Sequence, residues 1–167
     1  MVQIVFTING GDVAGAYVNE IIRRLENALP LMQDIAFYGE ETTQERIADT
    51  NVGPDGQAWK QSARAKADGG RTLFAEGNLH NDISSEATAD SAIWGANLIY
   101  ARIHQEGGVI EATNGKALHF AMPGGGFVTV KSVTIPARPY LGLSAENLEV
   151  IDGKIESYFL DGLVGTA

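Results

Sequence analysis

The sequence predicts one α+β domain, in which short antiparallel strands form a sheet packed against amphipathic N-terminal helices and followed by a C-terminal helix. Apolar residues recur at helical spacing near both ends of the chain, and alternating segments bounded by Gly, Pro and Asn lie between them. No internal repeat or low-complexity linker divides the 167 residues, of which 44% are hydrophobic and 20% charged. We therefore expect residues 1–167 to form a single domain around one core.

The first fifty residues predict a strand and two helices. Alternation over residues 2–8 is typical of a strand, which would end at Asn9-Gly10-Gly11. A helix should follow and end or kink at Pro30, with a weaker second helix over 31–49 packing beside it as a pair. The apolar face of the first helix comprises Val18, Ile21, Ile22, Leu25 and Leu29.

The middle of the chain alternates turns with short elements. Residues 53–56, Gly-Pro-Asp-Gly, are a strong turn signal. Residues 60–71 hold four of the twelve basic residues and little apolar matter, so we expect an exposed loop. The following elements are a short helix around 76–81, a hairpin of strands 83–88 and 91–95, and one or two helical turns over 98–105 closed by Gly107 and Gly108.

The last third predicts another hairpin and a helix. Residues 116–121 and 127–135 alternate as strands on either side of a glycine-rich tip at 122–126. Ser144 can cap the final helix, and residues 162–167 should fray. Its apolar face comprises Leu148, Ile151, Ile155, Tyr158 and Phe159.

Composition excludes several classes of function. Twelve Lys plus Arg against twenty-one Asp plus Glu give a net charge of −9, which disfavours a nonspecific grip on nucleic-acid phosphates and favours protein partners. The absence of Cys excludes disulfides, thiolate metal sites and thiol nucleophiles. No apolar stretch approaches the roughly 18 residues of a membrane span, so we expect no membrane association.

No set of residues in the sequence forms a coherent catalytic or cofactor site. His80, His104 and His119 lack metal-ligand spacing, and no Ser stands in a nucleophile elbow. The triple glycine at 124–126 lacks the Gly-Lys-Ser/Thr continuation of a phosphate loop. We therefore predict no catalytic residue, no metal ligand and no cofactor.

Two functional alternatives stay open on these residues alone. A hydrolase could use His104 with Glu106, although positions two apart on a helix do not face each other. The basic segment 60–71 could contact DNA, although four cations without aromatic neighbours are more often a solvated loop.

Four ordered segments carry motifs that point to a family. They read P-D-G-x-x-W at 54–59, L-x-x-x-G-x-L at 73–79, Y-A-x-x-H-Q-x-G-G at 100–108 and I-P-A-R-P-[FY]-L-G at 135–142. In this order they resemble the phage virion morphogenesis family, which includes the tail completion proteins of Mu-like phages. The resemblance covers about residues 54 to 159, and Glu106 departs from it by standing where an aromatic residue is expected.

The resemblance implies a structural protein of the virion neck or tail, acting in tail completion or head–tail joining and not as an enzyme. It implies a homo-oligomeric ring that contacts a tail terminator, tail tube or head–tail connector protein. A portal-proximal adaptor that contacts DNA is the alternative within this setting.

The motif residues predict corners and docking anchors. Paired glycines allow a left-handed exit from a helix, prolines hold an extended path, and an arginine offers a fork of donors. These residues could equally serve only the protein's own core. The candidate interface or structural residues are Trp59, Tyr100, His104, Gly107, Gly108, Arg138, Pro139, Tyr140 and Leu141.

Overall fold

The computed structural model describes residues 11–160, with side chains described from residue 14 onward. The strand expected over 2–8 and the fraying expected at 162–167 lie outside the described residues. Within them, helices combine with short antiparallel strands, so the α+β prediction is confirmed. None of the helices between residues 11 and 160 is long and apolar enough to cross a membrane.

The chain begins with two helices, α1 (Gly11–Glu26) and α2 (Leu29–Glu45), and α2 continues into a π-helical turn, η1 (Arg46–Thr50). Pro30 lies in the first turn of α2, where its missing N–H costs no helical hydrogen bond. The bend therefore falls just ahead of Pro30, at residues 27–28. Asn51 ends η1 in the left-handed conformation, and its N–H donates to the Arg46 carbonyl.

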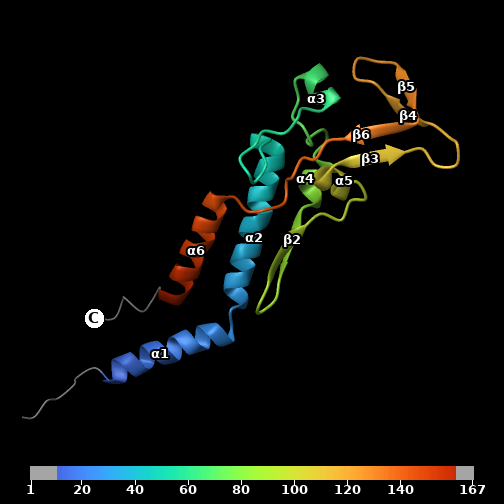
Figure 1. The fold of residues 1–167 in the computed structure, drawn as a ribbon. Coiled ribbons are helices and arrows are strands. Elements are labelled where there is room, and N and C mark those ends of the chain that lie inside the picture. Colours follow the sequence, from blue (N-terminus) through green and yellow to red (C-terminus); the bar gives the residue numbers. More distant parts are fainter. Residues whose placement is uncertain (1–10, 161–167) are drawn as a thin grey trace, which may run out of the picture.

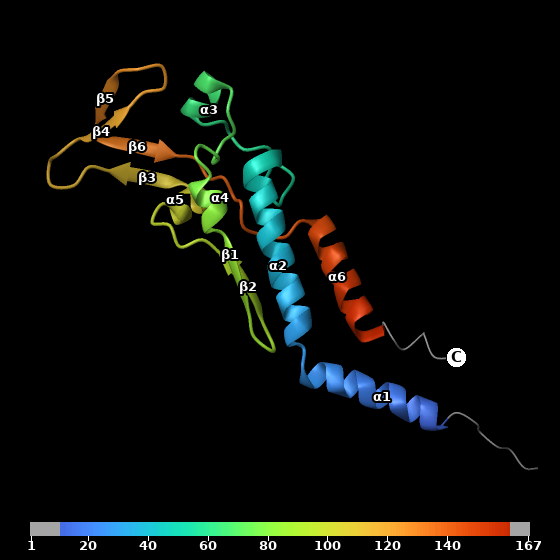
Figure 2. The same cartoon turned by 180° about the vertical axis from the view of Figure 1, so that it is seen from behind.

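The helix beside α2 is α6 (Ala145–Leu160) and not α1, so the expected N-terminal pair is wrong (Figures 1 and 2). Lys154 of α6 reaches Asp34 of α2 at 2.8 Å. Helix α2 packs against the first hairpin and α6, and these contacts take the place of the expected one with α1. α1 instead contacts the far end of α6, where the Tyr158 hydroxyl donates to the Asn27 carbonyl at 2.6 Å.

The predicted hairpin is confirmed as β1 (Ser84–Ala87) and β2 (Ala92–Gly95), paired antiparallel with Ser84 opposite Gly95. It lies along α2. Gly39 makes this close approach possible, because a Cβ at that position would lie 2.4 Å from the Trp94 ring. Trp94 thereby serves the packing of the hairpin on α2.

The strand expected over 127–135 is divided in two. β5 (Phe127–Val130) pairs with β4 (Leu118–Ala121), whereas β6 (Ser132–Ile135) pairs with β3 (Gly108–Glu111). Strand β3 was not predicted, because the glycines that begin it suggested only a helix cap. The strands consequently form three two-stranded sheets and not one continuous sheet.

Three short helices complete the fold: α3 (Ala63–Asp68), α4 (Asn78–Asp82) and α5 (Ala101–Glu106). Helix α3 corrects the prediction that residues 60–71 are simply an exposed loop. The Ser62 Oγ accepts a hydrogen bond from the Ala65 N–H at 3.1 Å, and Ala65 is buried. The N-cap and the three alanines of this segment therefore favour a helix, although its charges had suggested an exposed loop.

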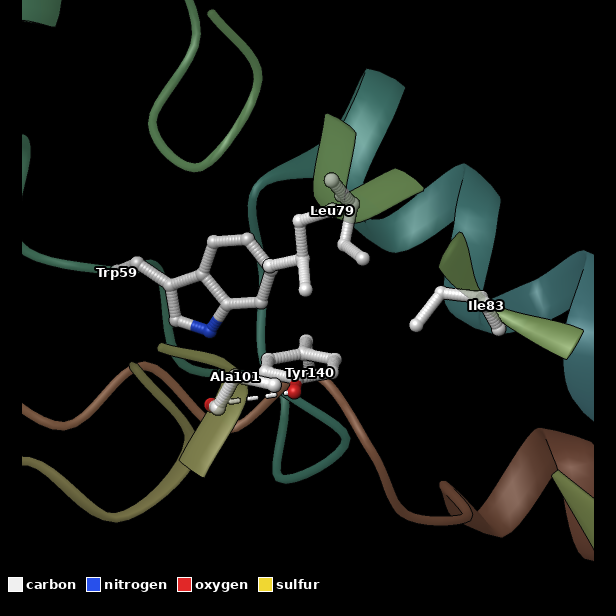
Figure 3. Packing of buried hydrophobic residues seen from close by; sticks show 6 residues of the cluster. Trp59, Leu79, Ile83, Ala101 and Tyr140 are labelled. Atoms are coloured by element: carbon white, nitrogen blue, oxygen red, sulfur yellow. Dashed lines mark hydrogen bonds between the residues drawn. The ribbon is translucent and has the colours of Figure 1, made fainter. Parts of the chain in front are cut away.

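The core lies where α2 and η1 meet the chain's middle segments. A cluster of buried residues joins elements that are far apart in sequence, and Figure 3 shows their side chains converging. The cluster comprises Ile47, Trp59, Leu79, Ile83, Ala101 and Tyr140. Four of these six, Trp59, Leu79, Ala101 and Tyr140, belong to the motifs identified in the sequence.

Candidate functional site: a junction around residues 136–142

Residues 136–142 run as an extended segment from β6 to the start of α6, with α5, η1 and the Trp59 segment against it. We call this segment, together with Arg46, Trp59, Ala101 and Gln105, the junction. Pro136 and Pro139 keep the segment out of any strand ladder because they lack an N–H. Its backbone groups are therefore bonded mainly by side chains of other elements.

Gln105 of α5 supplies several of these partners. Its Oε1 accepts the N–H groups of Tyr140 at 2.9 Å and Leu141 at 3.0 Å, and its Nε2 donates to the Leu141 carbonyl at 3.0 Å. The side-chain amide therefore pairs with the segment much as a neighbouring strand would. Gln105 was not among the predicted site residues, although it stands within the third motif.

Arg46 supplies the other partners from the opposite side. Its side chain is 7% exposed, and its Nη1 donates to the carbonyls of Tyr140 at 2.6 Å and Gly142 at 3.3 Å. Its Nη2 donates to Asn147 Oδ1 at 3.1 Å. Burial lowers the pKa of Arg46. The sequence shows no local sign that Arg46 is buried, because a charged residue next to an apolar one is common on any amphipathic helix.

Two aromatic anchors close the junction. The Trp59 indole Nε1 donates to the Pro139 carbonyl at 3.1 Å, and the hydroxyl of Tyr140, which is 1% exposed, donates to the Ala101 carbonyl at 3.2 Å (Figure 3). Burial raises the pKa of Tyr140, and the nearby Asp82 carboxylate adds to the effect. Leu141 packs against the core cluster from the side. Each anchor thus buries a ring and satisfies a backbone carbonyl.

The paired glycines form the corner between α5 and β3. Gly107 has φ +72°, and a Cβ there would lie 2.6 Å from the Ala137 backbone nitrogen. The Arg138 N–H donates to the His104 carbonyl at 2.8 Å just beside it. A Cβ on Gly108 would lie 2.8 Å from Ile103 Cδ1. Gly107 therefore permits a close backbone approach at the edge of the junction, whereas Gly108, at φ +152°, adopts a conformation that favours glycine.

Tyr100, His104 and Arg138 line a pocket of about 290 Å³, and Tyr140 is not among its lining residues. The Tyr100 and His104 rings meet edge to face with centroids 5.8 Å apart. Burial first, and then the Arg138 charge, lowers the pKa of His104, so the imidazole is neutral at neutral pH. Its Nδ1 is buried and has no hydrogen-bond partner among residues 11–160. Of the nine predicted residues, three therefore line this pocket and the other six do not.

The arrangement offers no acid–base pair for the hydrolase alternative. Glu106 bonds Arg102 at 2.8 Å on the exposed side of α5, whereas His104 turns toward the pocket. Within the described part of the chain, no group of three or more His, Asp or Glu side chains could hold a metal ion. The side chains of the junction instead form hydrogen bonds mainly with backbone groups.

Cations of the basic segment 60–71 also form bonds within the protein. Arg64 bonds Asp68 at 3.1 Å and the Phe74 carbonyl at 3.1 Å, and it donates to the Arg71 carbonyl. Arg71 pairs with Asp49 at 3.3 Å. Two of the four cations therefore stabilise the protein's own loop, which weakens the case for a DNA-binding surface.

Fold and junction together define an α+β structural module whose motif residues hold backbone segments in place. The chain belongs to the phage virion morphogenesis family, whose model matches residues 14–160. It is 31% identical over 158 residues to "Mu-like prophage FluMu G protein 2" of Haemophilus influenzae, which covers 94% of this chain and 96% of that protein. It is 31% identical over 124 residues to "Putative capsid assembly protein G" of Escherichia phage Mu, which covers 71% and 69%.

No solved structure matches the chain significantly. The family assignment, which rests on the family model and on these two relatives, supports a structural role in phage assembly that involves contacts with other phage proteins.

Proposed function

We propose that residues 1–167 form a single virion morphogenesis domain that completes the tail or joins head to tail, acting through protein contacts in a homo-oligomeric ring. One observation carries this proposal. Large apolar side chains are exposed on the strands β3 to β6 and on the helices α1 and α6. Strands β4 and β5 and helix α1 lie at opposite ends of an elongated molecule (Figure 1).

The first surface is on the arm, which we define as residues 108–135, containing β3 to β6. Both of its sheets have only two strands, and such ribbons are marginally stable without further packing. Phe127 at its tip is 84% exposed. The other exposed large apolar residues of the arm are Val109, Ile110, Phe120 and Met122. An arm of this kind is suited to packing against another protein.

The second surface is the helical face, which we define as Val18, Ile22 and Leu25 of α1 with Leu160 at the end of α6. All four side chains are exposed, and Leu25 is 62% exposed. Residues 18, 22 and 25 follow helical spacing and so share one side of α1. Two unlike surfaces on one chain favour head-to-tail contacts between copies, which close into a ring when the rotation permits.

The neighbours we propose are a tail terminator, a tail tube or a head–tail connector protein, with the ring located in the neck or tail. The phage Mu relative is described as a putative capsid assembly protein. A role at the boundary between head and tail accommodates both that description and the tail-completion resemblance. No catalytic step and no cofactor enters this proposal.

Electron microscopy of lysates from phage lacking this gene tests the proposal. We expect unjoined heads together with unfinished or free tails, and restoration of joined particles when the gene is supplied from a plasmid. Normal infectious particles in normal yield would contradict the assembly role. Joined particles in which a tagged copy is found only on the capsid shell would contradict the neck or tail location.

A further inference from the structure

Arg138 carries a buried charge that the described protein does not neutralise. Its side chain is 5% exposed, and burial lowers its pKa. Its Nε donates to the Lys60 carbonyl at 2.8 Å, and its backbone N–H donates to His104. Its Nη1 and Nη2 make no hydrogen bond or ion pair with any residue between 11 and 160. An unpaired buried charge costs free energy, so such a group points to a missing partner.

Arg138 lines the same pocket as Tyr100 and His104. Its other walls combine the apolar Leu73, Ala75 and Leu79 with the polar or charged Ser62, Arg64, Glu76 and Asn78. Leu73 has φ +66°, an uncommon conformation for a side chain of this size. Backbone strain of this kind persists where surrounding structure enforces it and often accompanies ligand sites.

The other charged groups of the pocket leave a positive interior. Arg64 is engaged by Asp68 and by backbone carbonyls. Glu76 lies at the exposed rim and forms no ion pair with Arg138. His104 adds no charge at neutral pH. A negatively charged group that entered the pocket would therefore meet the free end of Arg138 beside an apolar wall.

We propose that this pocket binds the carboxylate of an Asp or Glu side chain from a neighbouring virion protein, together with an adjacent apolar side chain. The inference rests on the proposed function, because it names the chemistry of a docking partner. A guanidinium fork matches a carboxylate with two parallel hydrogen bonds. The neighbouring apolar side chain fills the space between Leu73, Leu79 and Tyr100.

A protein carboxylate suits the pocket better than a nucleic-acid phosphate. The net charge of −9 repels a polyanion, and binding along a nucleic acid requires several cations in a row. Here a single free guanidinium shares its pocket with the apolar side chains of Leu73, Ala75 and Leu79. A single acidic side chain of a partner protein presents one charge with apolar neighbours and so matches this composition.

Nuclear magnetic resonance on the full chain, labelled with ¹⁵N at arginine, tests the inference with two capped dipeptides. We expect acetyl-Leu-Glu-amide to shift the Arg138 Nε–H signal saturably, with millimolar affinity. Acetyl-Leu-Gln-amide should bind at least about tenfold more weakly, because it loses a charged hydrogen bond. Equal binding of the two dipeptides, or no saturable shift, would overturn the proposal.

Matched variants locate the binding site. Ala75 is an exposed wall residue, so Ala75→Trp should block the pocket and abolish the shift. Ala67→Trp makes the same change on the exposed side of α3 and should leave binding unchanged. Glu76→Gln should bind at least as tightly as the parent chain, whereas weaker binding would make Glu76 part of the site.

The outcomes separate this inference from the ring. Dipeptide binding is measured on the purified chain, so a failure to bind would leave the assembly proposal standing. Conversely, normal particles from phage lacking the gene would contradict the assembly proposal but would leave the measured dipeptide affinity unchanged. Displacement of the dipeptide by an eight-nucleotide oligo-dT would overturn the carboxylate assignment in favour of a phosphate site. Retained binding in Ala75→Trp would also overturn it, because the dipeptide would then bind elsewhere.

Discussion

The junction and the arm share the chain's third and fourth motifs but differ in how they are held. In the junction, buried side chains satisfy the backbone of residues 136–142, and Tyr140 is almost fully enclosed. In the arm, the strands satisfy each other's backbone in pairs, and all four residues of β3 are exposed. The junction segment finds partners for its backbone within the chain, whereas the arm leaves most of its large apolar side chains exposed.

This difference separates folding from assembly. Mutations in the junction should act on the stability of the isolated protein, because they remove contacts that the folded chain already makes. Mutations on the arm should act on contacts with other proteins and leave the isolated chain nearly unchanged. The predictions below test this division, beginning with the largest expected effect on stability.

Arg46→Met should lower the free energy of unfolding by about 4 kcal/mol, because it leaves buried acceptors on Tyr140, Gly142 and Asn147 without a donor. Urea unfolding followed by tryptophan fluorescence measures the change, since Trp59 lies in the same junction.

Arg102→Met is the matched control. It makes the same change at an arginine whose side chain is 84% exposed and whose partner is Glu106 on the surface. The urea midpoint should hardly move, because exposed ion pairs contribute little. Equal destabilisation by the two substitutions would show that the buried hydrogen bonds of Arg46 contribute no more to the free energy of unfolding than an exposed ion pair does.

Gly107→Ala should cost about 3 kcal/mol, because it adds left-handed strain and places a Cβ 2.6 Å from the Ala137 backbone nitrogen. Gly125→Ala makes the same change at φ +104° in the arm, where a Cβ would meet nothing within 4 Å. Strain alone should then cost about 1 kcal/mol. Thermal unfolding of the two variants measures the difference, and a larger loss for Gly125→Ala would reverse the comparison.

The sequence predicted best those elements whose pattern is local. The helical spacing of Leu148, Ile151 and Ile155, with Ser144 ahead of it, identified α6, and the Ser144 Oγ accepts the Asn147 N–H at 3.2 Å. The hairpin of β1 and β2 was likewise found from alternation and its polar turn. In both cases neighbouring residues carry the information, so one sequence is enough.

The junction could be predicted only in part, because its contacts join distant positions. Trp59 and Tyr140 stood out as aromatic residues within motifs, yet the Trp59 acceptor is the carbonyl of Pro139, eighty positions away. Arg46 and Gln105 bind backbone groups, and backbone groups are the same in every residue type. No spacing rule in a single sequence indicates such partners, which is why these two residues were missed.

Phe127→Ser should change the free energy of unfolding least, by under about 0.5 kcal/mol, because the side chain is already 84% exposed. If the arm is a contact between copies or with a neighbouring protein, the same substitution should nevertheless reduce joined particles in a complementation assay of phage lacking the gene. Thr129→Ser, on the exposed side of β5, is a control expected to restore particles fully.

The two measurements on Phe127→Ser must be read together. Loss of particles with unchanged unfolding separates assembly from stability, as the comparison of arm and junction requires. Loss of particles with a matching loss of stability would place Phe127 in the fold itself, and full restoration of particles would remove the tip of the arm from the proposed interface. In the last case the helical face of one copy would have to contact a surface other than the tip of the arm on the next copy, since a head-to-tail ring needs two unlike surfaces on each copy.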